Sequence, residues 1–143
     1  MEQHILTMGN YRLACQLPQQ AVRQLVYFHS PVDDLTPPGD LLEQAGAAFL
    51  CITGEDWNAD LTPWPAERVF AKGGDFGGRA DRYLRVLTEE LLPFAEHSLH
   101  AEGLPRTLAG VSLSGLFAVY AAHRTDAFHR ICSVSGSLWY DGF

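Results

Sequence analysis

The chain has 143 residues, of which 47% are apolar, and ten Lys and Arg against seventeen Asp and Glu give a formal net charge of −7. This apolar content excludes a disordered chain, and an acidic balance without a basic cluster argues against nucleic acid and membrane partners. No apolar run approaches the roughly 18 residues of a membrane span, and the N-terminus carries no signal-peptide pattern. We therefore expect one soluble domain over residues 1–143.

The first elements are strands. Residues 5–8 and 11–17 flank Gly9 and Asn10, a pair suited to the positive φ angles of a tight hairpin turn. Residues 25–28 form a continuous apolar run, which is typical of a strand buried on both faces.

A short helix and a second buried strand follow. Asp40 is expected to cap a helix over residues 41–45, which ends at Gly46 in a left-handed conformation. Residues 47–53 are again a continuous apolar run. The turn-rich stretch over residues 54–78 is longer than the about 12–15 residues at which structureless loops in compact domains tend to be functional.

The second half alternates helix and strand. Apolar residues at spacings of three and four predict a helix over residues 79–100, in which Pro93 is expected to cause a kink. Residues 107–111 and 131–134 read as strands, and residues 116–122 as a helix between them. The alternation predicts a three-layer α/β/α sandwich with a mostly parallel sheet and an N-terminal antiparallel hairpin.

The cysteines and histidines show no metal-binding spacing. Cys15, Cys51 and Cys132 each lie in an apolar, strand-like run, so we expect three reduced core residues, which favours the cytoplasm. The six histidines are scattered along the chain. We expect neither a metal nor a cofactor.

The sharpest local signal lies between the strand at 107–111 and the helix that follows it. Ser112 is flanked by small residues two positions away on either side, Gly110 and Ser114, and then by Gly115. Small flanking residues permit a strained strand-to-helix turn that lifts the Ser112 hydroxyl above the sheet and aims the Leu113 N–H at a developing oxyanion. The alternative is an ordinary helix start capped by Ser112 or Ser114.

Further motifs occur in a fixed order along the chain. They are Trp57, residues 62–66 (TPWPA), 73–84 (GGDFGGRADRYL), 87–94 (LTEELLPF) and 133–140 (SVSGSLWY). Together with the serine turn, they resemble the esterase D-like branch of the α/β-hydrolases, the "putative esterase" family. Within that branch, they look like the esterases of the trilactone siderophores enterobactin, salmochelin and bacillibactin. The resemblance covers nearly the whole chain but only the front part of the family's domain, which implies a truncated α/β-hydrolase fold.

The resemblance implies an order of Ser, acid and His, with the last two on loops beyond this chain's last strand. The candidates after Ser112 are His123, His129, Asp126 and Asp141. The two histidines are expected at the sheet edge opposite the serine. Asp141 is expected nearer the site but has no histidine to orient. Because a serine without a base is a poor nucleophile, we expect a weak or inactive enzyme when the chain acts alone.

The family's second oxyanion donor comes from the loop at residues 29–34, in which Pro31 has no N–H to donate. His29 and Ser30 are candidate substrate-binding residues there, although a histidine that ends a buried strand is more often a structural hydrogen-bonder. Aromatic side chains above the strand ends suit a substrate pocket, or alternatively anchor loops. They are Trp57, Trp64, Trp139 and Tyr140. Glu55 and Asp56 are expected to be solvated or to cap a helix.

Two hypotheses follow. The first is a serine esterase with Ser112 as nucleophile and Leu113 N–H as oxyanion donor, whose base comes from another protomer or from sequence not present here. A thioesterase or acyl transferase could use the same turn. The second is an inactive hydrolase remnant that binds a small molecule or itself. The bare edge of the last strand predicts a homodimer through residues 128–140.

Overall fold

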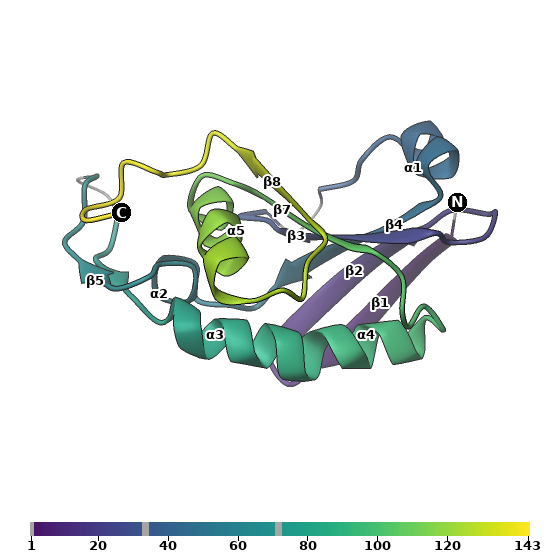
Figure 1. Cartoon of the computed structure of the whole chain (residues 1–143), viewed down its shortest axis with the longest axis horizontal. Coiled ribbons are helices and arrows are strands. Elements are labelled where there is room, and N and C mark those ends of the chain that lie inside the picture. The colour runs from purple at the N-terminus through teal and green to yellow at the C-terminus, as the bar shows by residue number, and fades with distance from the viewer. Residues whose placement is uncertain (1, 33–34, 71–72) are drawn as a thin grey trace.

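A single six-stranded sheet organises the protein. The computed structural model describes residues 2–32, 35–70 and 73–143. The sheet has the order β1-β2-β4-β3-β7-β8 (Figure 1). Its strands are β1 (Glu2–Met8), β2 (Tyr11–Leu17), β3 (Gln24–His29), β4 (Ala47–Thr53), β7 (Arg106–Val111) and β8 (Arg130–Val134). β1, β2 and β4 pair antiparallel, whereas β4, β3, β7 and β8 run parallel. The mostly parallel sheet with an N-terminal hairpin is therefore confirmed.

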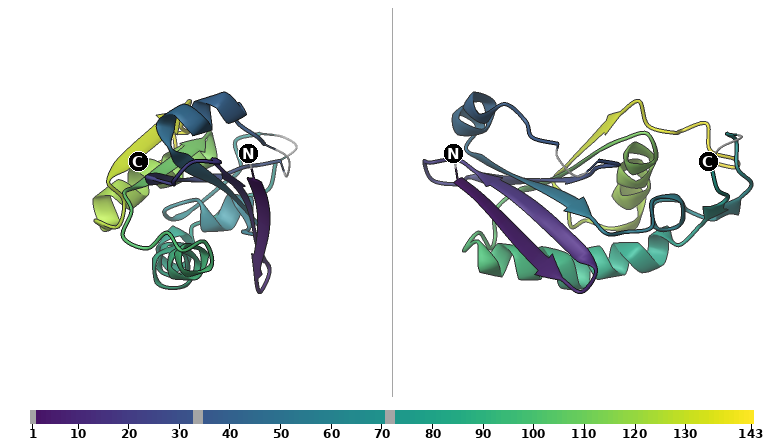
Figure 2. Two further views of the ribbon diagram at one scale, coloured as in Figure 1. Left: turned by 90° about the vertical axis from the view of Figure 1, so that its right-hand side faces the viewer. Right: turned by 180° about the vertical axis from the view of Figure 1, so that it is seen from behind.

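Helices cover both faces of this sheet. They are α1 (Gly39–Ala45), α2 (Trp57–Asp60), α3 (Ala80–Val86), α4 (Leu92–Ser98) and α5 (Leu113–Arg124), with a π-helical turn η1 (Leu87–Leu91) between α3 and α4. Alternate residues of β4 face opposite sides: Leu50 and Ile52 join the larger apolar cluster, and Phe49 and Cys51 the smaller one. Leu42 of α1 packs in the smaller cluster, so α1 lies on the face opposite α3 and α4 (Figure 2).

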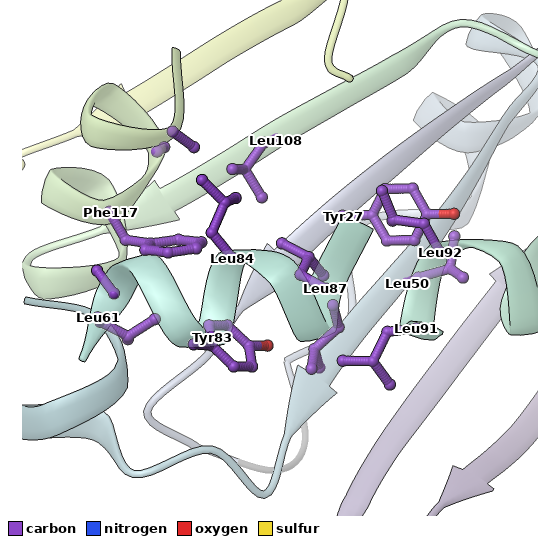
Figure 3. Packing of buried hydrophobic residues seen from close by; sticks show 14 of the residues in the cluster. Tyr27, Leu50, Leu61, Tyr83, Leu84, Leu87, Leu91, Leu92, Leu108 and Phe117 are labelled. Atoms are coloured by element: carbon purple, nitrogen blue, oxygen red, sulfur yellow. The ribbon is translucent and has the colours of Figure 1, made fainter. Parts of the chain in front are cut away.

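The long helical segment over residues 80–98 supplies much of the larger cluster. Tyr83, Leu87 and Leu91 are each at most 1% exposed, and Figure 3 shows them among side chains of the sheet such as Leu50 and Leu108. The sequence predicts a kink at Pro93; what the structure has is a π-helical turn directly before α4, whose first turn contains Pro93. Proline lacks the N–H that would continue the regular hydrogen-bond ladder, and such π-bulges accommodate the gap.

A buried ion pair fastens α4 to the sheet. Glu96 is 3% exposed, and its carboxylate accepts hydrogen bonds from the Arg106 Nε at 2.7 Å and Nη2 at 2.9 Å. It also accepts a bond from the Tyr27 hydroxyl at 2.7 Å. The bidentate geometry makes this a strong, charge-assisted contact between α4, β3 and β7.

The turn-rich stretch after β4 contains short elements of its own. Besides α2, it forms a two-stranded ribbon of β5 (Pro65–Ala66) and β6 (Phe76–Gly77). The Asp56 carboxylate caps α2 by accepting a bond from the Ala59 N–H at 3.1 Å, which is one of the two roles expected for Asp56. Residues 71 and 72 of this stretch lie outside the described residues.

Two local predictions were wrong. Cys132 is exposed rather than buried, because it lies on β8 at the sheet edge, whereas Cys15 and Cys51 are buried. Asp40 lies in the first turn of α1 and makes no side-chain cap; Pro38 holds the capping position instead. Gly46 does end α1 in the left-handed conformation, with φ 59°. In the described part of the chain, every helix is too short or too polar to cross a bilayer.

Candidate active site

Ser112 joins β7 to α5 in a strained conformation. Its φ of 56° and ψ of −121° lie in a region that residues other than glycine rarely adopt. Its side chain makes no capping bond to α5, and the residue is exposed. The structure thus shows the strained strand-to-helix turn that the sequence predicts, and it excludes Ser112 as an ordinary helix cap.

Glycines permit this turn because backbone segments cross closely around it. A Cβ atom on Gly110 would lie 2.2 Å from the carbonyl oxygen of Ser114. A Cβ atom on Gly115 would lie 2.8 Å from the Cα atom of Gly136. The first glycine lets α5 start directly above β7, and the second lets the segment after β8 pack against α5.

Ser114 occupies the position at which nucleophile turns usually carry a second glycine. Its hydroxyl accepts a hydrogen bond from the Val111 N–H at 2.8 Å and donates one to the Val111 carbonyl at 2.9 Å. The side chain therefore folds back onto the end of β7 and is 1% exposed. A serine fits here because its hydroxyl finds partners within the turn.

Leu113 is the first residue of α5. The N–H groups of the first helical turn have no intrahelical acceptors, and the helix dipole adds partial positive charge at this end. The Leu113 N–H belongs to this first turn, directly after Ser112, where the sequence predicts a donor for an oxyanion. This role stays a prediction.

A mainly apolar pocket of about 120 Å³ lies beside Ser112. It is lined by Trp57, Asn58, Val69, Phe70, Gly73, Gly74, Phe76, Ser112, Leu113, Ser137 and Trp139. Trp139, a predicted pocket residue, is 52% exposed and packs edge-on against Phe70 with ring centroids 6.2 Å apart. No charged side chain belongs to this lining among the described residues. The pocket therefore suits a neutral apolar group.

Trp64 and Tyr140 have an anchoring position instead. The Trp64 indole N–H donates to the Asp141 carbonyl at 2.7 Å, and the Tyr140 hydroxyl donates to the Trp64 carbonyl. Tyr140 is 2% exposed. Neither residue lines the pocket beside Ser112. Their contacts fix the segment that carries Trp139, which is the loop-anchoring alternative for these aromatic residues.

His29 is a core residue. It is fully buried, its Nε2 lies 2.6 Å from the Tyr83 hydroxyl, and its ring packs edge-on against Tyr83 and Phe117. Burial lowers the pKa of His29 to about 3, so its imidazole is neutral near pH 7. The side chain lines neither the pocket beside Ser112 nor the one beside Ser30, and its placement matches the structural hydrogen-bonder rather than a substrate-binding residue.

Ser30 and Pro31 follow β3 and line a second, shallower pocket of about 400 Å³, which also includes Trp57. The Ser30 hydroxyl accepts a bond from the Val32 N–H at 3.1 Å. Ser30 is 4% exposed, and its role as a substrate-binding residue stays a prediction. Asp33 and Asp34, the remainder of the predicted oxyanion loop, lie outside the described residues.

Glu55 lines the same second pocket. It is not the solvated or capping side chain that the sequence predicts. Its Oε2 atom is buried and has no hydrogen-bond partner among the described residues. Burial raises the pKa of Glu55 to about 7, with a smaller contribution from the negative charge of Asp60. Burial thus favours the protonated form of Glu55 more than in an exposed glutamate.

The two candidate histidines lie away from Ser112. The Nδ1 atom of His129 accepts a bond from the N–H of Arg106, the first residue of β7, whereas Ser112 follows the last residue. At ~3.3 Å per residue, these ends are roughly 20 Å apart. His123 lies in the last turn of α5, and Ser112 precedes its first. Within the described ranges, no histidine is hydrogen-bonded to Ser112.

Ser137 is a residue of this site that lies within the motif at residues 133–140, but the sequence predicts no role of its own for it. The Oγ atoms of Ser112 and Ser137 are 3.4 Å apart, and the Ser137 N–H donates to the Ser112 carbonyl at 3.0 Å. The signal that could have found it is the strand order: β7 and β8 are parallel neighbours, so the segments after their C-terminal ends meet. Within the described residues, no group of three or more His, Cys, Asp or Glu side chains could hold a metal ion.

The chain is similar to known proteins in sequence. Residues 9–141 match the profile of a protein family described as "Putative esterase". Over 85 residues, which is 57% of this chain, it is 35% identical to the uncharacterized protein YbbA of Bacillus subtilis and covers 34% of that protein.

Two solved structures have a similar fold. An IroE-like serine hydrolase from Shewanella oneidensis has a TM-score of 0.79 at 21% identity, and the match covers 99% of this chain and 52% of that one. The siderophore hydrolase EstA from Aspergillus nidulans has a TM-score of 0.66 at 18% identity, covering 96% of this chain and 57% of that one. The chain thus spans about half the length of these hydrolases.

Proposed function

The chain belongs to the Putative esterase family, and from this premise we propose that it provides the nucleophile and acyl pocket of a carboxylic-ester hydrolase. Ser112 is the nucleophile and the Leu113 N–H is the oxyanion donor. The observation that carries this proposal is the strained, exposed Ser112 at the N-terminus of α5, beside an apolar pocket.

The reaction follows from this placement. The Oγ atom of Ser112 attacks the ester carbonyl carbon while its proton passes to an imidazole general base. The tetrahedral oxyanion accepts a hydrogen bond from the Leu113 N–H. When the intermediate collapses, the bond between the carbonyl carbon and the alkoxy oxygen breaks, and the base returns the proton to the departing alcohol. Water then hydrolyses the acyl-enzyme by the same route.

The general base is the part that the described residues do not bring to Ser112. We propose that it comes from a second copy of the chain or from polypeptide outside residues 1–143. In a serine protease, loss of the histidine base alone costs about 10⁶ in turnover, so these residues alone turn over slowly.

Siderophore esters are the proposed substrate class. The similarity to the Aspergillus siderophore hydrolase supports this choice, together with the sequence motifs around the serine turn. The aromatic lining by Trp57, Phe76 and Trp139 offers stacking surfaces for an aromatic acyl group.

The test is hydrolysis of p-nitrophenyl butyrate by the wild-type protein and by Ser112→Ala, each with and without added imidazole. We expect slow hydrolysis by the wild type that rises with imidazole concentration beyond the rate of imidazole alone. Ser112→Ala should show no protein-dependent rate. Equal rates in the two proteins would contradict Ser112 as the nucleophile.

A second candidate is a homo-oligomeric binding protein without turnover. It is favoured by the exposed edge strand β8, where Val134 is 55% exposed, and by Leu138 and Trp139, which are 50% and 52% exposed. This proposal predicts a homodimer through residues 128–140. A single monomer boundary in sedimentation velocity at tens of micromolar protein would contradict it.

A further inference from the structure

Two serine hydroxyls face each other at the pocket beside Ser112. The Oγ atom of Ser137 lies 3.4 Å from the Oγ atom of Ser112, and both residues line the pocket. They differ in exposure: Ser112 is exposed, whereas Ser137 is 2% exposed. The buried Ser137 hydroxyl thus lies next to the exposed Ser112 hydroxyl.

The backbone holds Ser137 in this place. Its N–H donates to the Ser112 carbonyl at 3.0 Å, and its own carbonyl accepts from the Tyr140 N–H at 3.0 Å. The Tyr140 hydroxyl in turn donates a hydrogen bond to the Trp64 carbonyl. The Ser137 backbone is therefore tied to the nucleophile on one side and to the anchored C-terminal segment on the other.

The neighbouring Ser133 provides a contrast. The Ser133 hydroxyl donates to the Gly115 carbonyl at 2.9 Å, which is an ordinary link between the strand end and α5. The Ser137 hydroxyl instead has the Ser112 hydroxyl as its side-chain partner in the described structure. Of the two hydroxyls, that of Ser137 therefore lies against Ser112 and that of Ser133 against a backbone carbonyl.

We propose that Ser137 is a further catalytic residue, whose hydroxyl donates a hydrogen bond to the Ser112 oxygen as that oxygen becomes nucleophilic. This role rests on the proposed function of Ser112. The 3.4 Å separation is longer than a strong O–H···O bond, and catalytic bonds are often long before substrate binds and shorten in the reacting complex. A hydrogen bond to a charged oxygen is about twice as strong as one between neutral groups, so the bond favours the reacting state.

The hydrogen bond from the Ser137 hydroxyl strengthens as negative charge develops on the Ser112 oxygen. Ser137 itself transfers no proton. With a fluorophosphonate probe, the Ser112 oxygen–phosphorus bond forms as the phosphorus–fluorine bond breaks and fluoride leaves. The Ser112 proton passes to imidazole supplied in the buffer. Ser137 keeps its proton throughout and stabilises the Ser112 oxygen before the new bond has formed.

The experiment measures the second-order rate of fluorophosphonate labelling in 100 mM imidazole across pH 6–9 for the wild type, Ser137→Ala and Ser133→Ala. Intact-protein mass spectrometry reads the adduct, and circular dichroism with a thermal melt reports the fold of each variant. Ser137→Ala keeps the backbone bond to Ser112, so the fold should survive. Ser137→Thr restores a hydroxyl.

We expect Ser137→Ala to be labelled about 10- to 100-fold more slowly than the wild type, below the effect of one oxyanion-hole donor in well-studied proteases. Its labelling rate should rise with pH as the added imidazole loses its proton, as in the wild type, but stay lower at every pH. Ser133→Ala should match the wild type, and Ser137→Thr should regain part of the rate. A folded Ser137→Ala within twofold of the wild type overturns the role of Ser137 alone. A wild type without an adduct at Ser112 overturns the proposed function, and the role of Ser137 with it.

Discussion

Gly110 is the position at which one added methyl group should disturb the serine turn most. In Gly110→Ala, the new Cβ would lie 2.2 Å from the Ser114 carbonyl oxygen and 2.3 Å from its carbonyl carbon. Both separations are more than 1 Å shorter than the ~3.5 Å of an ordinary contact. Overpacking typically costs about 1–3 kcal/mol, and here the obstructing atoms are backbone and cannot rotate away. We expect a loss of about 3 kcal/mol of unfolding free energy.

Urea denaturation and thermal melts measure this effect. For a chain of this size, about 3 kcal/mol lowers Tm by roughly 10 °C. Labelling of Ser112 should also slow, because the start of α5 must shift to relieve the clash. Gly73→Ala is the matched control for stability, since its Cβ would meet its nearest neighbour at 3.7 Å, and it should change unfolding by less than about 0.5 kcal/mol. A Gly110→Ala protein as stable and as readily labelled as the wild type would refute the reasoning about the turn.

Three further changes test the buried polar groups. In the folded protein burial raises the pKa of Glu55 from 4.5 to about 7, so ionisation of Glu55 costs stability as the pH rises through this window. Glu55→Gln should therefore gain up to about 3 kcal/mol relative to the wild type at pH 8 and little at pH 4; an equal gain at both pH values would contradict the raised pKa. Tyr83→Phe leaves the buried His29 Nε2 unpaired and should cost about 1–3 kcal/mol in urea denaturation, and no cost would mean that the bond contributes nothing. Glu96→Gln breaks the bidentate pair with Arg106, whose side chain is one-quarter exposed. We expect the unfolding free energy in the same assay to fall by about 2–3 kcal/mol, with little dependence on salt. A loss below about 0.5 kcal/mol would show that the pair is dispensable.

The sheet could be predicted because each of its strands carries a local signal. The turn at Gly9 and Asn10 and the apolar runs of β3, β4 and β7 specify strands whatever their neighbours are. The serine turn was predictable for the same reason, since small residues at fixed spacing are needed for the backbone crossing at Gly110.

Features that depend on neighbours could not be read from local patterns. Cys132 lies in an apolar run like a core residue, but β8 is an edge strand, so its exposure is decided by the sheet order. The position of Ser137 beside Ser112 depends on the parallel pairing of β8 with β7. Glu55 is a charged residue in a polar stretch, and only the packing around it raises its pKa.

The most direct test of Ser112 as a nucleophile without a base of its own is the dependence of its labelling on a supplied base. Fluorophosphonate is added to the wild type and to Ser112→Ala at pH 7.5 over a series of imidazole concentrations, and peptide mass spectrometry locates the adduct. We expect slow modification of residue 112 that accelerates in proportion to imidazole and is absent from the variant. Rapid modification without imidazole would show that the chain already brings a base to this serine, and no adduct at any concentration would show that the serine is not a nucleophile.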